Sequence, residues 1–197
     1  MNKKLKKNLI EYGIIGAVFI MLFVTGLHTE VFGFLQRGIL ATGLMNPNTE
    51  EKAEVAATTP AKGAILDLNL VNSKGEQVNM KQFKGKVIFL NFWATWCPPC
   101  IAEMPGIHNL YKEVKDDNVE FIMLSVDQDF EKAKKFKKNK GYEFEIYQAT
   151  DPIPQMYSTR NIPTTYVIDY EGNIALTHLG MGNFDTNDFK QFLKNLQ

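Results

Sequence analysis

An apolar run that leads directly into a helix constrains the fold of this chain more than any other feature. Residues 86–93 are nearly all apolar, which is typical of a strand that is buried on both faces in the middle of a sheet. Residues 98–114 place apolar side chains at helical spacing. Further strand and helix patterns alternate up to the C-terminus. This alternation predicts an α/β domain with a central mixed sheet flanked by helices.

The predicted domain covers residues 63–197 and contains several further elements. Strands are expected at residues 65–70, 86–93, 119–126, 144–147, 164–169 and 174–179. Helices are expected at residues 98–114, 130–140, 152–158 and 185–196. A turn at residues 73–76 and a hairpin between the last two strands complete the pattern. The lysines of residues 130–140 are interpreted as a solvated helix face rather than a binding patch.

The N-terminal part of the chain has a different character. Four lysines precede an apolar run: Lys3, Lys4, Lys6 and Lys7. The run approaches the roughly 20 residues that span a bilayer core. We therefore expect residues 1–8 in the cytoplasm and a single-pass signal anchor at residues 9–28. The domain that follows would lie outside the cytoplasm, in the periplasm, attached to the cell membrane. A cleaved signal peptide and a buried core helix are the alternatives to an anchor.

Residues 29–62 form a predicted juxtamembrane segment and flexible linker. Residues 31–44 mix apolar and polar side chains, which fits an amphipathic helix on the membrane surface. A continuation of the membrane helix or a loosely ordered stalk fits equally well. Residues 46–62 are polar and rich in Thr, Ala, Glu and Pro, so they are expected to be a flexible tether.

The chain has only two cysteines, Cys97 and Cys100, and they form one CxxC motif. Cys97 is placed where the strand ends and the helix begins, and the positive end of the helix favours a thiolate there. Cys100 lies one turn further and can resolve a mixed disulfide at Cys97. Pro98 and Pro99 have no N–H groups to donate, which predicts a moderate lowering of the thiol pKa and a fairly reducing couple. The pattern indicates a redox-active disulfide between nucleophile and resolving thiol.

Other chemistries have weaker support in the sequence. Two cysteines do not complete a tetrahedral zinc site, and His28, His108 and His178 are scattered, so no metal and no other cofactor is expected. His108 is interpreted as a surface residue. The formal net charge of +0 provides no global field that would favour nucleic acid.

Residues 92–100, FWATWCPPC, resemble the active-site run of the thioredoxin superfamily, and specifically its TlpA/ResA-like branch of membrane-anchored oxidoreductases. The resemblance covers residues 63–197 and implies a thioredoxin-like fold. Residues 119–147 resemble the strand and helix that this branch inserts. Residues 161–165 resemble the cis-proline loop, which implies a cis Ile162–Pro163 bond facing the cysteines, and Pro105 resembles the proline that kinks the helix. The substrate surface implied in this way comprises Trp96, Pro98, Ile162 and Pro163.

Two positions depart from ordinary thioredoxin. Asn91 stands where thioredoxin has a buried Asp that accepts the proton of the resolving thiol, and an amide cannot titrate. Glu103, three residues after Cys100, matches an acidic residue of the TlpA/ResA-like branch. We expect it beneath the site, where it would exchange a proton with Cys100; a surface glutamate is the alternative. The predicted catalytic residues are therefore Cys97, Cys100 and Glu103.

The expected function is reduction of disulfides in exported proteins by a monomeric enzyme. The resemblance implies a role in cytochrome c biogenesis and cell redox homeostasis, with apocytochrome c as a substrate. A thiol-type electron donor in the membrane would recharge the enzyme, and membrane lipid would surround the N-terminal helix. A disulfide oxidase or isomerase needs the same residues with another reduction potential. A metal-binding or chaperone module is the alternative from another class.

Overall fold

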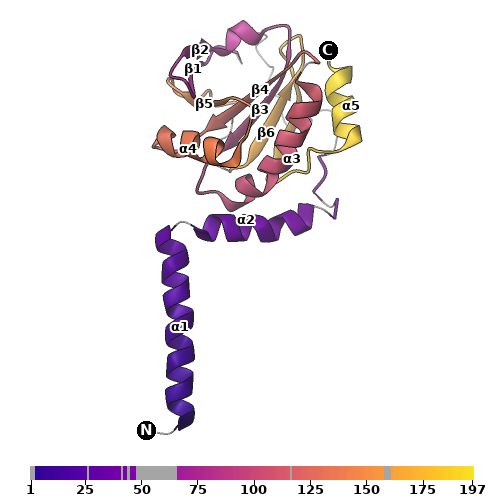
Figure 1. Cartoon of the computed structure of the whole chain (residues 1–197). Helices are drawn as coiled ribbons and strands as arrows, with labels where there is room; N and C mark the ends of the chain where they lie inside the picture. Colours follow the sequence, from indigo (N-terminus) through magenta and orange to yellow (C-terminus); the bar gives the residue numbers. More distant parts are fainter. Residues whose placement is uncertain are drawn as a thin grey trace.

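The computed structural model describes residues 3–25, 27–40, 42–43, 45–47, 66–115, 117–157 and 161–197. It places an α/β domain at one end of the molecule and two N-terminal helices at the other (Figure 1). The predicted tether at residues 46–62 lies largely outside the described residues.

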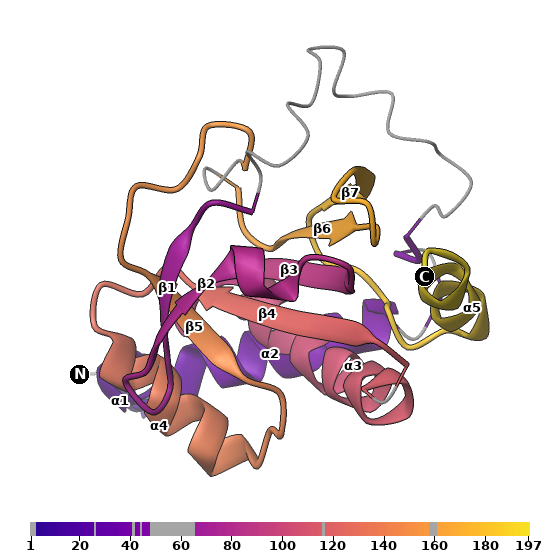
Figure 2. The same cartoon turned by 90° about the horizontal axis from the view of Figure 1, so that it is seen from above.

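The domain is built on one mixed sheet of seven strands, in the order β2-β1-β5-β4-β3-β6-β7 (Figure 2). The strands are β1 (Asn69–Asn72), β2 (Gln77–Asn79), β3 (Val87–Trp93), β4 (Val119–Ser125), β5 (Ile146–Ala149), β6 (Thr164–Ile168) and β7 (Ile174–Leu179). β3 pairs in parallel with β4 and antiparallel with β6. All residues of β3 are buried, as its near-continuous apolar sequence predicts. The thioredoxin-like mixed sheet is thus confirmed.

The three α-helices of the domain cover the same face of this sheet. α3 (Pro98–Val114), α4 (Phe130–Lys140) and α5 (Asn187–Asn195) contribute to one core cluster with side chains of β3, β4 and β6. The opposite sheet face is covered by the 3-10 helix η1 (Met80–Phe83), by residues 66–68 and by the segment around Tyr157. The segment predicted to be inserted, residues 119–147, forms β4, α4 and the start of β5.

Several predicted elements need correction. The first strand begins at Asn69 rather than at residue 65, and the fourth lies at Ile146–Ala149 rather than at residues 144–147. The helix expected at residues 152–158 is wrong, because residues 152–154 have no regular secondary structure and a turn follows. Pro152 and Pro154 explain this, since proline disfavours helical geometry at the residue before it and has no N–H to donate. β2 and η1 were not predicted.

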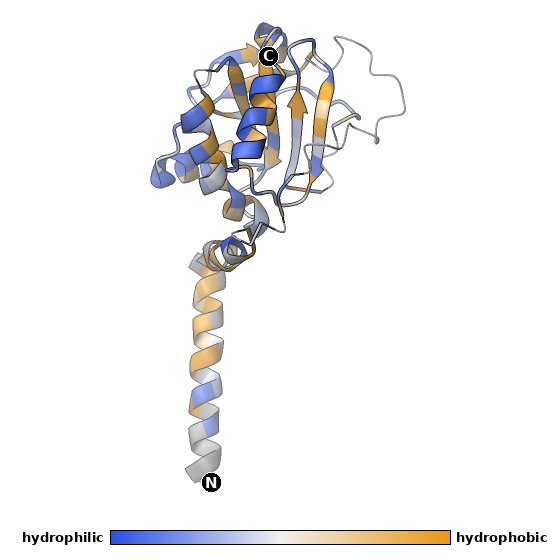
Figure 3. Ribbon diagram, turned by 90° about the vertical axis from the view of Figure 1, so that its right-hand side faces the viewer, coloured by the Kyte–Doolittle hydropathy of each residue, from blue (hydrophilic) through white to orange (hydrophobic). Residues whose placement is uncertain are grey.

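Two helices precede the domain. α1 (Lys3–Thr25) projects away from it, and α2 (Leu27–Leu40) lies crosswise to α1, between α1 and the domain (Figure 1). Apolar residues dominate the half of α1 next to α2 (Figure 3). By combined length and mean hydropathy, none of the described helices qualifies as a membrane span. The anchor expected at residues 9–28 is therefore not confirmed.

Candidate active site

The two cysteines lie where β3 has ended and α3 begins. Cys97 is the N-cap of α3, and Pro98 and Pro99 occupy its first turn, where a missing N–H group costs least. Cys97 and Cys100 are joined in a disulfide with an S–S distance of 2.09 Å. Cys97 is 4% exposed and Cys100 is fully buried. Cys97 is therefore the more accessible partner, as expected for the nucleophile, although it is far less exposed than the sequence suggested.

The first turn of α3 leaves one N–H group directed at Cys97. The backbone N–H of Cys100 donates to Cys97 Sγ at 3.3 Å, because Pro98 and Pro99 have no hydrogen to offer. Together with the positive end of the helix, this donor favours a thiolate at Cys97 once the disulfide is reduced. The site thus supports thiol–disulfide exchange with Cys97 as the attacking sulfur.

The loop that precedes β6, the strand next to β3, lies beside the disulfide. The Ile162–Pro163 peptide bond is cis, as predicted. The Ile162 carbonyl oxygen lies 3.7 Å from Cys97 Sγ. Trp96, at 59% exposure, is the most prominent apolar side chain beside the cysteines, whereas Pro163 is buried. Three of the four expected substrate residues are therefore at least partly accessible, and the fourth, Pro163, is not.

Glu103 lies in the interior and not on the surface of α3. Its side chain is 1% exposed. Asn91 Nδ2 donates to Glu103 Oε1 at 2.9 Å, and the backbone N–H of Gly182 donates to Oε2, also at 2.9 Å. Burial raises the pKa of Glu103 to about 8, and the hydrogen bonds from Gly182 and Asn91 offset only part of this rise. The interpretation of Glu103 as a surface residue is therefore wrong.

Asn91 acts as a fixed support for this carboxyl group. It is fully buried in β3 and donates its second amide hydrogen to Thr165 Oγ1 of β6 at 2.9 Å. An amide cannot titrate, so Glu103 is the titratable group of this hydrogen-bonded set. Gly182 completes the support because an added Cβ would lie 2.6 Å from the ring of Phe184, which leaves room only for glycine.

A second buried carboxyl group was missed by the sequence reasoning. Asp127 follows β4, is 3% exposed, and accepts from the hydroxyl of Ser125 at 2.8 Å. It also accepts from the hydroxyl of Thr95 at 2.7 Å and from the Thr95 N–H at 3.0 Å. The carboxyl ends of the parallel strands β3 and β4 lie side by side. Parallel pairing of these two strands would have predicted that Asp127 lies close to the loop before Cys97. Asp127 thus fixes the loop that delivers Cys97.

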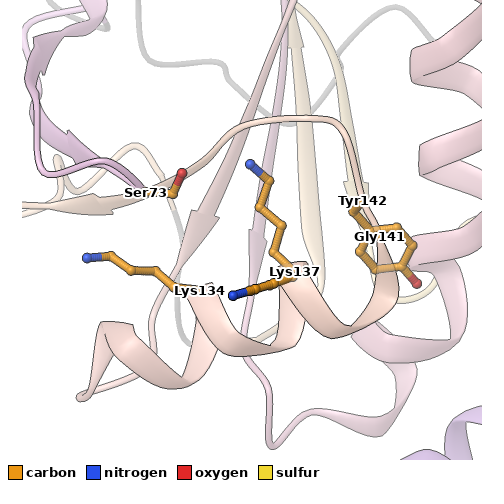
Figure 4. A pocket seen from close by; sticks show the side chains of 6 residues that line it. Ser73, Lys134, Lys137, Gly141 and Tyr142 are labelled. Carbon is orange, nitrogen blue, oxygen red and sulfur yellow. The ribbon is translucent and has the colours of Figure 1, made fainter.

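The remaining candidates do not form a site. His108 is half-buried at the surface, where it packs against Tyr142 and Phe144 and accepts a hydrogen bond from the Glu143 N–H. The described ranges contain no cluster of side chains that could hold a metal. A pocket of about 290 Å³ lies between α4 and the turn after β1 (Figure 4). Lysines and Tyr142 line it, and Lys134 and Lys137 are already paired with glutamates.

Comparison with known proteins agrees with this geometry. Residues 61–177 match the model of the AhpC/TSA family. The thiol-disulfide oxidoreductase ResA of Geobacillus kaustophilus is 31% identical over 172 residues, which cover 87% of this chain and 95% of that protein. ResA of Bacillus thuringiensis is 36% identical over 126 residues, which cover 64% of this chain and 69% of that protein.

A solved structure from Chlorobium tepidum, described as a thiol:disulfide interchange protein DsbE, shares the fold with a TM-score of 0.58. It is 27% identical and covers 67% of this chain and 94% of its own. A disulfide at a helix N-terminus, a facing cis-proline loop and these relatives lead to one conclusion. The chain belongs to the thioredoxin-like AhpC/TSA family and is a thiol–disulfide oxidoreductase.

Proposed function

We propose that this enzyme reduces disulfides in exported proteins, with apocytochrome c as a candidate substrate. The observation that carries the proposal is Glu103, a buried acid with a pKa near 8 held one helical turn beyond the resolving cysteine. A carboxyl group whose pKa lies near neutrality can both accept the proton of the Cys100 thiol and return it. Such a pair suits a dithiol that must release its second proton inside the protein.

The reaction proceeds in two exchanges. The Cys97 thiolate attacks one sulfur of the substrate disulfide, forms a mixed disulfide and expels the other substrate sulfur as a thiolate, which takes a proton from water. Cys100 then transfers its proton to ionised Glu103 and attacks Cys97 Sγ. This step forms the Cys97–Cys100 disulfide and releases the second substrate thiolate. Two electrons pass to the substrate, and the enzyme is left in the oxidised form described above.

Recharging requires a reduced dithiol of another protein, and a thiol-type donor in the membrane fits the expected location. The support for this location is the lysine cluster followed by an apolar run, together with the exposed apolar side chains of α1. The catalytic domain would then lie outside the cytoplasm. Reporter fusions to the C-terminus test this topology: a reporter active only in the cytoplasm should stay inactive, and its activity would contradict the export.

The direction of electron flow is tested by the reduction potential of the full chain in detergent. A potential near or below about −250 mV is expected for a reductant. A potential near −120 mV, which is typical of a strong oxidant, would contradict the proposal and favour an oxidase.

Substrates are identified with a Cys100→Ser variant expressed in the native compartment. The missing resolving thiol should leave substrates bound to Cys97 as mixed disulfides, and these should be exported proteins with paired cysteines. A Cys97→Ser variant is the control and should trap none. Capture of cytoplasmic proteins alone would contradict the proposed substrate class.

A further inference from the structure

Helix α2 directs polar side chains toward the domain and large apolar side chains away from it. At about 100° per residue, one side of α2 packs against the domain and carries Gly33, Gln36, Arg37 and Leu40. The other side points away from the domain and is between 43% and 69% exposed at its large residues, Val31, Phe32, Phe34, Leu35 and Ile39. A helix on a water-exposed surface has the reverse arrangement.

The inward side of α2 is not a good apolar interface. Gln36 Oε1 and Arg37 Nε are buried there without a hydrogen-bond partner among the described residues. Burying polar atoms without partners costs free energy, and so does exposing five large apolar side chains to water. Rotation of α2 about its axis would relieve both costs in water. The orientation observed therefore indicates that its outward side meets an apolar medium.

The inward side nevertheless approaches the domain very closely, and it does so beside the cysteines. A Cβ added at Gly33 would lie 3.3 Å from the Pro98 carbonyl oxygen and 3.3 Å from Ile101 Cγ2. Leu40 packs with Ala102 of α3 and with Met181. α2 is thus seated on the end of α3 that carries the disulfide.

The chain just after α2 strengthens the same attachment. The Asn183 N–H donates to the Met45 carbonyl oxygen at 2.9 Å, and Asn183 Nδ2 donates to Asn46 Oδ1 at 3.1 Å. Asn183 adjoins Gly182, whose N–H holds Glu103. Gly33 and Leu40 of α2, and Met45 and Asn46 beyond it, therefore all contact the active-site end of the domain.

The surface of α1 indicates what covers the outward side of α2. Its large apolar side chains are more than half exposed and, at about 100° per residue, spread over roughly 220° of the helix circumference: Ile14, Ile15, Val18, Ile20, Met21 and Val24. A helix of a second copy would cover a stripe about 100° wide, whereas lipid can cover the whole of this wider surface. α2 lies crosswise to α1, at the end of α1 where apolar residues dominate (Figures 1 and 3).

We propose that α2 lies on a lipid surface and holds the dithiol end of the domain toward the bilayer. The inference rests on the membrane attachment proposed above and adds an orientation to it. Cys97 would then be reached most readily by thiols that are held at the membrane surface. A domain on a flexible tether alone would instead present Cys97 equally in all directions.

The test uses the reduced full chain reconstituted in vesicles of phosphatidylcholine and phosphatidylglycerol. Alkylation of Cys97 is measured with a maleimide on a phospholipid headgroup and, separately, with a water-soluble maleimide. The ratio of the two alkylation rates reports orientation. A change in the reactivity of the Cys97 thiol would alter both rates and leave their ratio unchanged. Gly33→Leu should push α2 off the domain and lower the ratio about tenfold or more. Gly38→Leu is the matched control, because an added Cβ there meets nothing within 4 Å.

A second variant keeps the inference testable if Gly33→Leu does not fold. Phe34→Glu with Leu35→Glu leaves the inward side intact but repels lipid, and it should lower the same ratio. Unchanged ratios in both variants would overturn the orientation, as would specific cross-links between the α2 helices of two copies. Loss of the wild-type chain from floated vesicles would overturn the membrane attachment as well. The readout needs no protein substrate, so it is independent of whether exported proteins are reduced.

Discussion

Two buried carboxyl groups flank the disulfide, and their surroundings differ. Asp127 accepts from the hydroxyl groups of Thr95 and Ser125 and from the backbone N–H of Thr95, which lies two residues before Cys97. Glu103 accepts from one amide and one backbone N–H, and its burial raises its pKa to about 8. The first set of contacts holds a loop in place. The second leaves an acid that can gain and lose a proton near neutral pH.

The difference teaches that burial alone does not mark a catalytic acid. The contacts of each carboxyl group and its position relative to the two cysteines indicate its role. Glu103 lies on the same helix as Cys100 and one turn further, whereas Asp127 contacts Thr95, before Cys97. We therefore assign proton exchange to Glu103 and positioning of the loop to Asp127.

Removal of either cysteine should lower the rate of disulfide reduction most, because both sulfur atoms take part in the exchange reaction. Cys97→Ser should reduce insulin disulfides no faster than buffer. Cys100→Ser should still attack but should stop at the mixed disulfide, visible as a covalent adduct by mass spectrometry. Equal adduct formation by both variants would show that nucleophile and resolving thiol are wrongly assigned, and with them the role of Glu103.

Glu103→Gln should lower turnover at pH 7 by about 10²-fold, the usual cost of losing a general base. The amide keeps the size of the side chain but cannot take the proton of Cys100. The rate of insulin reduction across pH 5 to 9 checks this, with Asp127→Asn as the matched variant. If Asp127→Asn slows the reaction as much and changes its pH profile in the same way, the distinction between the two groups fails.

Asp127→Asn should act mainly on stability. It replaces one acceptor oxygen by a donor that faces the hydroxyl of Thr95 or Ser125, which costs roughly 1–3 kcal/mol. Chemical unfolding of the reduced and oxidised chain in detergent would measure this loss. An unchanged free energy of unfolding would mean that the hydroxyl contacts of Asp127 do not hold the loop.

The last expected effect is a pH slope in stability. The folded pKa of Glu103 is raised above its ordinary value of 4.5, so its protonated form favours the folded state. That contribution is complete below about pH 4.5 and is lost as the pH rises toward about 8. Relative to Glu103→Gln, the wild type should lose up to about 1.4 kcal/mol per pH unit in this range. Parallel pH curves for the two proteins would contradict the burial of a titrating Glu103.

Local sequence patterns predicted the parts of the fold that local physics decides. The buried run of β3 and the proline-started α3 were located to within one residue, because a hydrophobic strand and a helix N-terminus both have strong local signals. β2 (Gln77–Asn79) is short and polar at the sheet edge, so it offers no such signal. The prolines at 152 and 154 explain why the helix predicted there does not form, because each disfavours helical geometry at the residue before it.

The site was predictable only in part for a similar reason. Cys97 and Cys100 are defined by their spacing, and the cis bond at Pro163 and the role of Glu103 followed from family resemblance. The N–H of Gly182 that holds Glu103 is 79 residues away in the sequence, and the contact of Gly33 with Pro98 joins separate parts of the chain. Such contacts depend on tertiary packing and leave no local pattern.

The central claim is that Glu103 holds the exchangeable proton of the active site. Its most direct test is a carbon-13 NMR titration of glutamate carboxyl groups in the full chain in detergent, with Glu103→Gln identifying the resonance. The account predicts a midpoint near pH 8 for Glu103. A midpoint near its ordinary value of 4.5 would contradict it, because Glu103 would then be ionised throughout turnover and unable to hold the proton of Cys100.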